Sequence, residues 1–138
     1  ASKSAVKVSG DLRTTLALND RLTPKNSNDQ SMPFLHWWPR MGTQEWVEYH
    51  FANPEKVQQV EVYWFDDGPW GGCRVPAAWT LKYRSGSEWL PVASPSGFGV
   101  AKDTFNVTTF APVETTALRI EVQFQKEVSG GMLEWVVK

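Results

Sequence analysis

The segment YWFDDGPWGGCRVPAAW, residues 63–79, brings together side chains that often do chemistry. It contains two adjacent acids, Asp66 and Asp67, followed by Cys73 and Arg74. A pair of carboxylates can hydrolyse a glycosidic bond, but the two groups then stand roughly 5 to 9.5 Å apart on opposite sides of the sugar. Adjacent residues are too constrained for that arrangement, so this acid pair does not predict a glycosidase site.

Cys73 is the other candidate for catalysis, as a nucleophile with His36 as its base. A catalytic cysteine needs a base that a third group orients, and the sequence assigns no such group. A single cysteine in a glycine-rich turn is more often a small packed residue. We therefore predict that the chain has no catalytic residues and is not itself an enzyme.

Sugar binding makes better use of these residue types. An aromatic ring can stack against the C–H face of a sugar, while charged groups hydrogen-bond its neighbouring hydroxyls. The loop 66–74 and the segment FLHWWPR, residues 34–40, supply both kinds of group. The predicted ligand-binding residues are His36, Trp38, Arg40, Asp67, Trp70 and Arg74.

Two tryptophans carry most of this prediction. Adjacent residues of an extended chain point to opposite sides, so one of Trp37 and Trp38 should lie in the core, and we assign the exposed position to Trp38. Trp70 lies between Pro69 and Gly71, outside any alternating pattern. Trp70 is therefore the best candidate for stacking against a sugar.

Two other interpretations of this loop stay open. Asp66 or Asp67 can form a salt bridge with Arg74, and Gly71-Gly72 can make a tight turn, which would give a rigid connector without a ligand. Alternatively, the aromatic and arginine side chains can form a surface that docks against a neighbouring catalytic domain.

The elements that must position these residues are β-strands, because apolar and polar residues alternate along much of the chain. In residues 118–124, for example, Leu, Ile, Val and Phe share one face, and Arg, Glu and Gln share the other. About eight short strands separated by turn residues predict an all-β sandwich of two sheets. The expected strands are 5–8, 46–51, 57–65, 79–83, 88–92, 104–110, 118–124 and 132–137, with a hairpin turn at 85–87 and a long irregular loop over 19–45.

Composition narrows the function further. The 138 residues suit one domain, residues 1–138, and the 14 basic and 15 acidic residues nearly cancel. Nucleic acid and membrane surfaces are therefore poor candidates for partners. One cysteine cannot form an internal disulfide, and His36 and His50 lack the spacing of zinc ligands. The eight tryptophans are many for a domain of this size, which favours a role for some of them outside the core.

A series of landmarks along nearly the whole chain resembles the discoidin domain, also called the coagulation-factor type C domain. The narrower resemblance, through residues 24–29 and 64–76, is to the C-terminal discoidin-like module of bacterial glycoside hydrolases of the β-L-arabinofuranosidase-like type. Two features depart from the family pattern: Arg21 stands where a glycine is usual, and the terminal cysteine pair is absent. The landmarks are Leu18-Asn19-Asp20, Trp37-Trp38, Glu45 to Phe51, Val57 to Val62, Trp79 to Tyr83, Glu88 to Val92, Ala117 to Ile120 and Gly130 to Trp135.

The resemblance implies a jelly-roll β-sandwich of about eight strands, sugar binding by loops at one end, and a structural calcium ion. Calcium prefers six to eight oxygen ligands, which a loop of main-chain carbonyls and one or two carboxylates can supply. The alternative is that Asp20 caps a turn and Glu134 is a solvated strand residue. The ligands that the resemblance implies are the side chains of Asp20 and Glu134 and the carbonyls of Ala17, Leu22 and Lys25.

We therefore expect a non-catalytic accessory module of an exported bacterial glycoside hydrolase, located outside the cell or in the periplasm. Its first five residues lack the apolar stretch of a signal peptide, yet the chain can still be a piece of a larger exported protein, which is what we expect. The expected partners are a plant-type polysaccharide or oligosaccharide and the parent's catalytic domain. In the alternative, the same residues serve only to pack the module against that catalytic domain.

Overall fold

The computed structural model describes residues 5–9 and 21–138 of the chain, and this part is built of β-strands and loops. It contains no helix long and apolar enough to cross a membrane, as judged over the same residues. The strands are β1 (Ala5–Val8), β2 (Leu35–His36), β3 (Gln44–Phe65), β4 (Ala78–Ser85), β5 (Glu88–Pro91), β6 (Phe105–Gln123) and β7 (Gly131–Val137).

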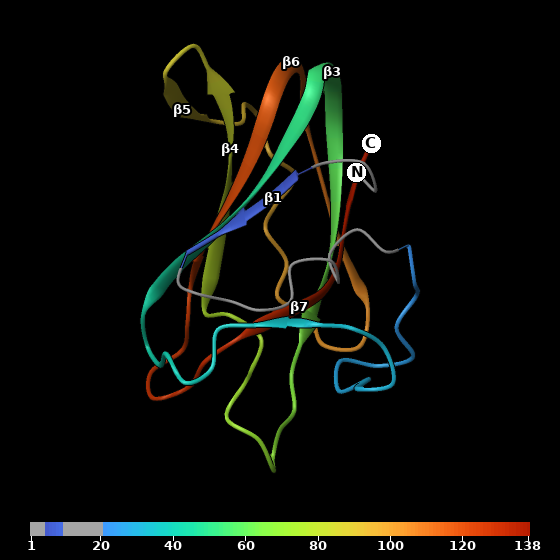
Figure 1. The fold of residues 1–138 in the computed structure, drawn as a ribbon, viewed down its shortest axis with the longest axis vertical. Coiled ribbons are helices and arrows are strands. Elements are labelled where there is room, and N and C mark those ends of the chain that lie inside the picture. The colour runs from blue at the N-terminus through green and yellow to red at the C-terminus, as the bar shows by residue number, and fades with distance from the viewer. Residues whose placement is uncertain (1–4, 10–20) are drawn as a thin grey trace.

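Two long strands, β3 and β6, organise the fold (Figure 1). The strands expected at 46–51 and 57–65 are the two halves of β3, and those expected at 104–110 and 118–124 lie in or next to β6. The β3–β6 register shifts between His50 and Glu55, where each long strand passes from one layer to the other. Six strands of the described residues thus account for the eight expected ones. The seventh, β2, was not predicted, because its two residues lie within the segment 19–45 that we expected to be irregular.

The halves of the two long strands lie in different layers. The first layer runs β1, the first half of β3, the second half of β6, β4 and β5. The second layer contains the first half of β6, the second half of β3, β7 and β2. The fold prediction is confirmed in its class: the chain is an all-β sandwich of the jelly-roll kind.

Aromatic rings from both layers meet in the core. Trp64 of β3 and Trp79 of β4 pack edge to face, with ring centroids 5.6 Å apart. Tyr49 of β3 stacks on Trp135 of β7 at 3.9 Å. Edge-to-face and stacked pairs of this kind add to the stability that burial of their area provides. The alternation of the sequence therefore points the large rings inward from both sheets.

A second, smaller apolar cluster lies outside the main core. It buries Met32, Tyr63, Phe65, Cys73 and Leu133, and Phe34 and Phe105 pack against it. The loop that contributes Met32 is fastened at Ser27, whose backbone N–H donates to Asp103 Oδ1 and whose hydroxyl accepts from the Asp103 N–H, each at 2.7 Å. This cluster matters for function because it supports the loop end of the sandwich.

The two ends of the sandwich differ in their connections (Figure 1). At one end, residues 85–87 make the predicted hairpin turn between β4 and β5, and Gly86 there has a φ of 59°. At the opposite end, the loop between β3 and β4 projects beyond the rest of the molecule. That projecting loop is the segment from which the sequence analysis started.

Candidate functional site

The projecting loop and the segment around β2 enclose a pocket of about 380 Å³, which we call the end pocket. Pockets that bind small molecules commonly have volumes of about 300 to 1,000 Å³. The residues that line the end pocket are Gln30, Phe34, His36, Trp38, Phe65, Asp67, Trp70, Gly71, Gly72 and Cys73. Four of the six predicted ligand-binding residues, His36, Trp38, Asp67 and Trp70, are among them.

The two adjacent glycines of the loop allow these side chains to come together. A Cβ atom at Gly72 would lie 2.0 Å from Trp38 Cζ3, so the Trp38 ring rests directly on the Gly72 backbone. A Cβ atom at Gly71 would lie 1.8 Å from Asp67 Oδ2. Real Cβ contacts are never this short, so any larger residue would displace Trp38 or Asp67. The absence of side chains at Gly71 and Gly72 therefore makes room for both Asp67 and Trp38.

The Trp37-Trp38 pair behaves as alternation predicts. Trp37 is fully buried in the core, and its backbone N–H donates to the Gly130 carbonyl at 2.9 Å. Trp38 is 46% exposed and faces the end pocket. The prediction that Trp38 is the exposed member of the pair is confirmed.

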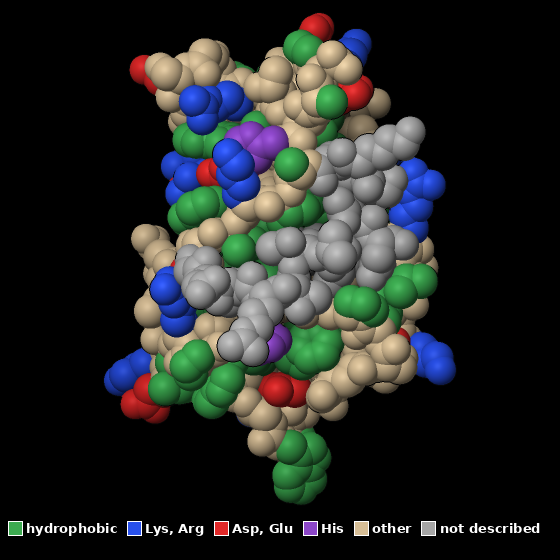
Figure 2. All heavy atoms as spheres, in the orientation of Figure 1, with side chains coloured by type: hydrophobic (Ala, Val, Ile, Leu, Met, Phe, Trp, Pro, Cys, Tyr) green, Lys and Arg blue, Asp and Glu red, His purple; other side chains and the backbone are tan. Residues whose placement is uncertain are grey.

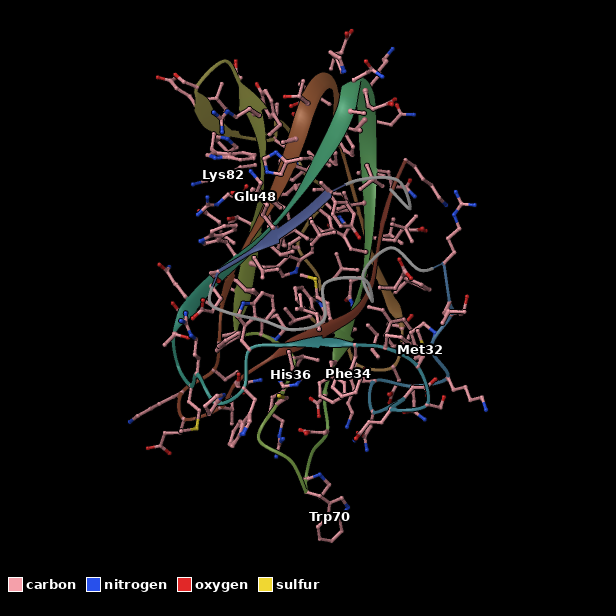
Figure 3. The ribbon with its side chains drawn as sticks, in the orientation of Figure 1. Met32, Phe34, His36, Glu48, Trp70 and Lys82 are labelled. Carbon is pink, nitrogen blue, oxygen red and sulfur yellow. The ribbon has the colours of Figure 1, made fainter. Side chains whose placement is uncertain are left out.

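Trp70 stands at the tip of the projecting loop. It is 91% exposed, and Figure 3 shows its ring extending beyond the rest of the molecule. Figure 2 shows the same apolar projection in the space-filling view. An indole this exposed adds little to the stability of the fold, so it is available to stack on a ligand or a partner.

His36 is placed by the strand β2, whose two residues pair with β7 at Met132 and Gly131. Its Nδ1 is buried and makes no hydrogen bond with a described residue. The other ring nitrogen, Nε2, is then the atom of His36 that can hydrogen-bond a ligand. The pairing of β2 with β7 therefore fixes the backbone that carries the His36 ring.

The acid pair divides into a structural residue and a pocket residue. Asp66 is buried, and its carboxylate accepts from the N–H groups of Gly68 at 3.0 Å and Val75 at 3.1 Å, which closes the loop. Asp67 lines the end pocket, while its Oδ1 accepts from the Cys73 N–H at 2.8 Å. Only Asp67 can therefore act on a ligand in the pocket.

The two predicted arginines lie outside the lining of the end pocket. Arg74 Nη1 donates to the carbonyls of Gly71 at 2.7 Å and Cys73 at 2.8 Å, and it lies 3.6 Å from Asp67 Oδ1. That geometry matches the salt bridge of the connector interpretation. Arg40 pairs with the buried Glu45 at 3.1 Å. Both guanidinium groups are thus used to hold loops in place.

Cys73 is a packed residue, as expected for a cysteine in a glycine-rich turn. Its side chain belongs to the second apolar cluster, and burial, followed by the charge of Asp67, raises the pKa of the thiol to about 12. The reactive form of cysteine is the thiolate, so at neutral pH Cys73 is not a nucleophile. The geometry of the described residues gives no support to catalysis at this site.

Sequence reasoning missed the apolar floor of the end pocket. Phe34 and Phe65 stack there with ring centroids 4.3 Å apart, and Gln30 lines the rim. Phe34, His36 and Trp38 alternate along one side of an extended segment, so the argument applied to Trp38 would also have found Phe34. Phe65 directly precedes the acid pair, but only the folded chain shows that it turns away from the core.

The predicted calcium ligands are only partly within the described residues. Ala17 and Asp20 lie outside them, whereas Leu22, Lys25 and Glu134 lie inside. Glu134 is 3% exposed, so the alternative of a solvated strand residue is wrong for it. No group of three or more His, Cys, Asp or Glu side chains that could hold a metal occurs in the part of the chain described.

Asp29 shapes the described part of the loop that contains Leu22 and Lys25. Asp29 Oδ2 accepts from the Lys25 N–H at 2.9 Å, and Oδ1 accepts from the Ser31 N–H at 3.1 Å. The hydrogen bond from the Ser31 hydroxyl, followed by that from the Lys25 backbone, lowers the pKa of the Asp29 carboxyl. Asp29 was not among the predicted residues, and its role here is to shape the loop.

Comparison with known proteins identifies the fold of this chain. No family model and no curated protein sequence matches the chain. Among solved structures, a chain of the β-galactosidase BgaA of Streptococcus pneumoniae matches with a TM-score of 0.82 and 19% identity, covering 99% of this chain and 92% of that one. The chain has a discoidin-like fold. This confirms the broad resemblance found in the sequence, while the narrower likeness to β-L-arabinofuranosidase modules remains a prediction.

Two further matches are to modules described as binding carbohydrate. The family 32 module of NanJ from C. perfringens, solved in complex with galactose, gives a TM-score of 0.70 at 13% identity and covers 97% of this chain and 92% of that one. Chitosan-binding module 1 from a chitosanase/glucanase of Paenibacillus sp. IK-5 gives 0.67 at 13% identity, covering 98% and 94%. At these identities the likeness establishes the fold.

Proposed function

We propose that this chain is a non-catalytic carbohydrate-binding module that holds a sugar in the end pocket. The observation that carries the proposal is the placing of two exposed indoles, Trp38 and Trp70, beside Asp67 and His36 at the loop end of the sandwich. Proteins of the same fold have been solved with galactose and as a chitosan-binding module, which supports the same class of ligand here.

Each group of the end pocket has a task in this proposal. The indoles of Trp38 and Trp70 stack on the C–H faces of the sugar. Asp67 Oδ2 accepts no hydrogen bond from a described residue, so it can accept one from a sugar hydroxyl, and His36 Nε2 can bond a second hydroxyl. The stacked Phe34 and Phe65 form the dry floor beneath.

Calorimetric titration with oligosaccharides of arabinan, galactan and pectin tests this proposal. Trp70→Ala and Trp38→Ala should each weaken binding about tenfold, because a stacked aromatic ring contributes on the order of 1 kcal/mol or more. Met41→Ala, which removes an exposed apolar side chain outside the end pocket, should change nothing. Absence of binding across all three glycan classes would contradict the proposal.

The parent context is part of the same proposal. We place the module in an exported bacterial glycoside hydrolase, outside the cell or in the periplasm, where it would keep the catalytic domain near a plant-type polysaccharide. The support is the narrower sequence resemblance and the match to a chain of a bacterial β-galactosidase.

Docking against the parent's catalytic domain is the second candidate function. The projection of Trp70 beyond the end pocket favours it, because an apolar tip of this kind can insert into a partner's surface. In this case Trp70→Ala should lower the melting temperature of the full-length enzyme and leave that of the isolated module unchanged. No change in either would contradict docking.

A structural calcium ion also belongs to the proposal. Glu134 is a buried carboxylate on β7, which suits the hard oxygen ligand that the resemblance assigns to it, with Asp20 and the carbonyls of Ala17, Leu22 and Lys25. A chelator should then lower the melting temperature, and calcium should restore it, more than magnesium does. Elemental analysis that finds no calcium, together with no response to added calcium, would remove this part.

A further inference from the structure

A second hollow lies on the outer face of the first layer, where β3, β6 and β4 run side by side. We call it the face groove; its volume is about 370 Å³, and none of its lining residues lines the end pocket. The register of the three strands places Trp46, Glu121 and Thr80 side by side in one row across its floor. The lining residues are Gln44, Glu45, Trp46, Ala78, Trp79, Thr80, Arg119, Glu121, Val122 and Gln123.

Arg119 is the central charged group of the face groove. Its guanidinium lies 4.5 Å from the centroid of the Trp46 ring, and its Nη1 donates to Glu48 Oε2 at 2.9 Å. Its Nε lies 3.2 Å from Glu121 Oε2, and Lys82 Nζ lies 2.6 Å from the other oxygen of Glu121. Stacking and pairing on several sides fix the position of Arg119 before any ligand arrives.

The charges of this network balance. Lys82 and Arg119 face Glu48 and Glu121, and every one of the four is paired with an opposite charge. Glu48 also lies 2.7 Å from His50 Nε2 and is only 8% exposed. An ionic ligand would have to compete with these pairs, whereas a neutral polar ligand can bond the remaining donors and acceptors.

Neutral polar groups complete the groove. The side chains of Gln44 and Thr80 are exposed and make no hydrogen bond with a described residue. The Gln123 amide group donates from Nε2 to the carbonyl of Phe124 at 3.1 Å, which fixes its orientation and leaves its oxygen as an acceptor. Together with the apolar surface of Trp46, these groups match a ligand that alternates hydroxyl groups and C–H faces.

The shape of the groove indicates a chain and not a single ring. Neighbouring strands lie about 4.8 Å apart, so a floor across three strands is about 10 Å wide. The groove lies on the flat of the sheet, and Figure 3 shows Glu48 and Lys82, from the row next to it, well away from His36 and Trp70 at the loop end. A ligand in the face groove would therefore lie across the strands and away from the loop end.

From these contacts we propose that the face groove is a second binding site, which takes the interior of an uncharged oligosaccharide chain. Arg119 and Glu121 bond neighbouring hydroxyls, Trp46 packs against a ring, and Gln44, Thr80 and Gln123 supply further hydrogen bonds. The site is separate from the end pocket, and this proposal holds whether or not the end pocket binds sugar.

The experiment uses nitrogen-edited NMR spectra, in which the indole N–H signals of Trp46 and Trp70 report on the two sites separately. The probes are hexasaccharides of β-1,4-galactan, α-1,5-arabinan, xylan and cellulose, their monosaccharides, and hexagalacturonate as an anionic comparison. At least one neutral hexasaccharide should shift the Trp46 signal, with an affinity at least tenfold above that of its monosaccharide and of hexagalacturonate.

Blocking variants identify the groove. Ala78→Trp and Thr80→Arg each fill it from an exposed strand position and should weaken binding of that hexasaccharide at the Trp46 signal at least tenfold. The control, Val107→Trp, introduces the same indole as Ala78→Trp at an exposed position of β6 outside the groove and should change nothing. Far-UV circular dichroism checks that all variants fold.

Three results would overturn the proposal: hexasaccharide shifts confined to Trp70, equal binding by the monosaccharide, or full binding by both blocking variants. None of these results counts against the end pocket, whose own test is the loss of binding in Trp70→Ala. Loss of binding in Trp70→Ala with no response at Trp46 would support the end pocket alone.

Discussion

The end pocket and the face groove, the two binding sites that we propose, hold their side chains in place by different means. The end pocket is made mainly of loop residues, and its side chains are positioned by contact with backbone, as Trp38 is by Gly72. The face groove is made of strand residues, and its side chains are positioned by register and by the ion pairs around Arg119. We therefore expect substitutions in the end pocket to act mainly on ligand binding, and substitutions in the face groove to cause the larger losses in the free energy of unfolding.

The largest effect should come from breaking the ion pairs of the face groove. Arg119→Met keeps an apolar stem over Trp46 but leaves the buried Glu48 with His50 as its one remaining partner among the described residues. Breaking one member of a buried pair is costly, and because Arg119 is partly exposed we expect a loss of about 2 to 3 kcal/mol in the free energy of unfolding. Urea denaturation measures this loss.

Arg84→Met is the matched control for that variant. Arg84 lies 5.4 Å from the Trp89 ring centroid and donates to the carbonyl of Gly86, and none of its described contacts is an ion pair with a buried acid. Its loss should lower the free energy of unfolding by about 0.5 kcal/mol or less. Equal losses in the two variants would show that the ion pairs around Arg119 do not stabilise the fold.

A smaller loss of stability is expected from disturbing the contact between Trp38 and Gly72. Gly72→Ala places a Cβ atom where Trp38 Cζ3 now lies, so the ring must swing away and lose its packing. We expect a loss of about 1 to 2 kcal/mol in stability, with weaker binding at the end pocket and unchanged binding at the face groove. Calorimetry and denaturation measure the two losses.

The double variant Trp38→Ala/Gly72→Ala sharpens this result. Once the ring is absent, the alanine Cβ at residue 72 meets no obstacle from it, so the two substitutions should be strongly non-additive. Additive effects would mean that Trp38 does not rest on Gly72 in solution.

The smallest effect should appear only at high pH, through Cys73. Its pKa is raised from 9.0 to about 12 in the folded chain, so the unfolded chain loses this proton first, and stability falls as pH rises between those two values. From pH 8 to pH 10, the stability of the native chain should fall by about 1 kcal/mol more than that of Cys73→Ala. Parallel stability curves for the two proteins would show that the thiol is not buried.

Alternation along the sequence predicted most of the fold, because the side-chain period of a strand is visible locally. It divided β3 in two, since the segment FANPEK around Pro54 has the composition of a turn, although it lies within the long strand. The tip of the 85–87 hairpin was predicted correctly because its glycine chemistry is also local.

The candidate site was predicted unevenly for the same reason. The exposure of Trp38 follows from its neighbour Trp37, so two adjacent residues suffice. The partners of Arg40 and Arg74 depend on which carboxylate the folded chain brings near, and the sequence holds many carboxylates. The face groove was missed entirely, because it exists only once the register of three strands is known.

The close contacts at the loop tip have a consequence for how such a module can diversify. Gly71 and Gly72 are fixed by Asp67 and Trp38, and a Cβ atom at Gly68 would lie 2.7 Å from the guanidinium carbon of Arg74. Between these glycines, Trp70 extends into solvent and is 91% exposed. Evolution, or a designer's library, could therefore change the contacts that the tip makes through Trp70 while the scaffold beneath stays the same.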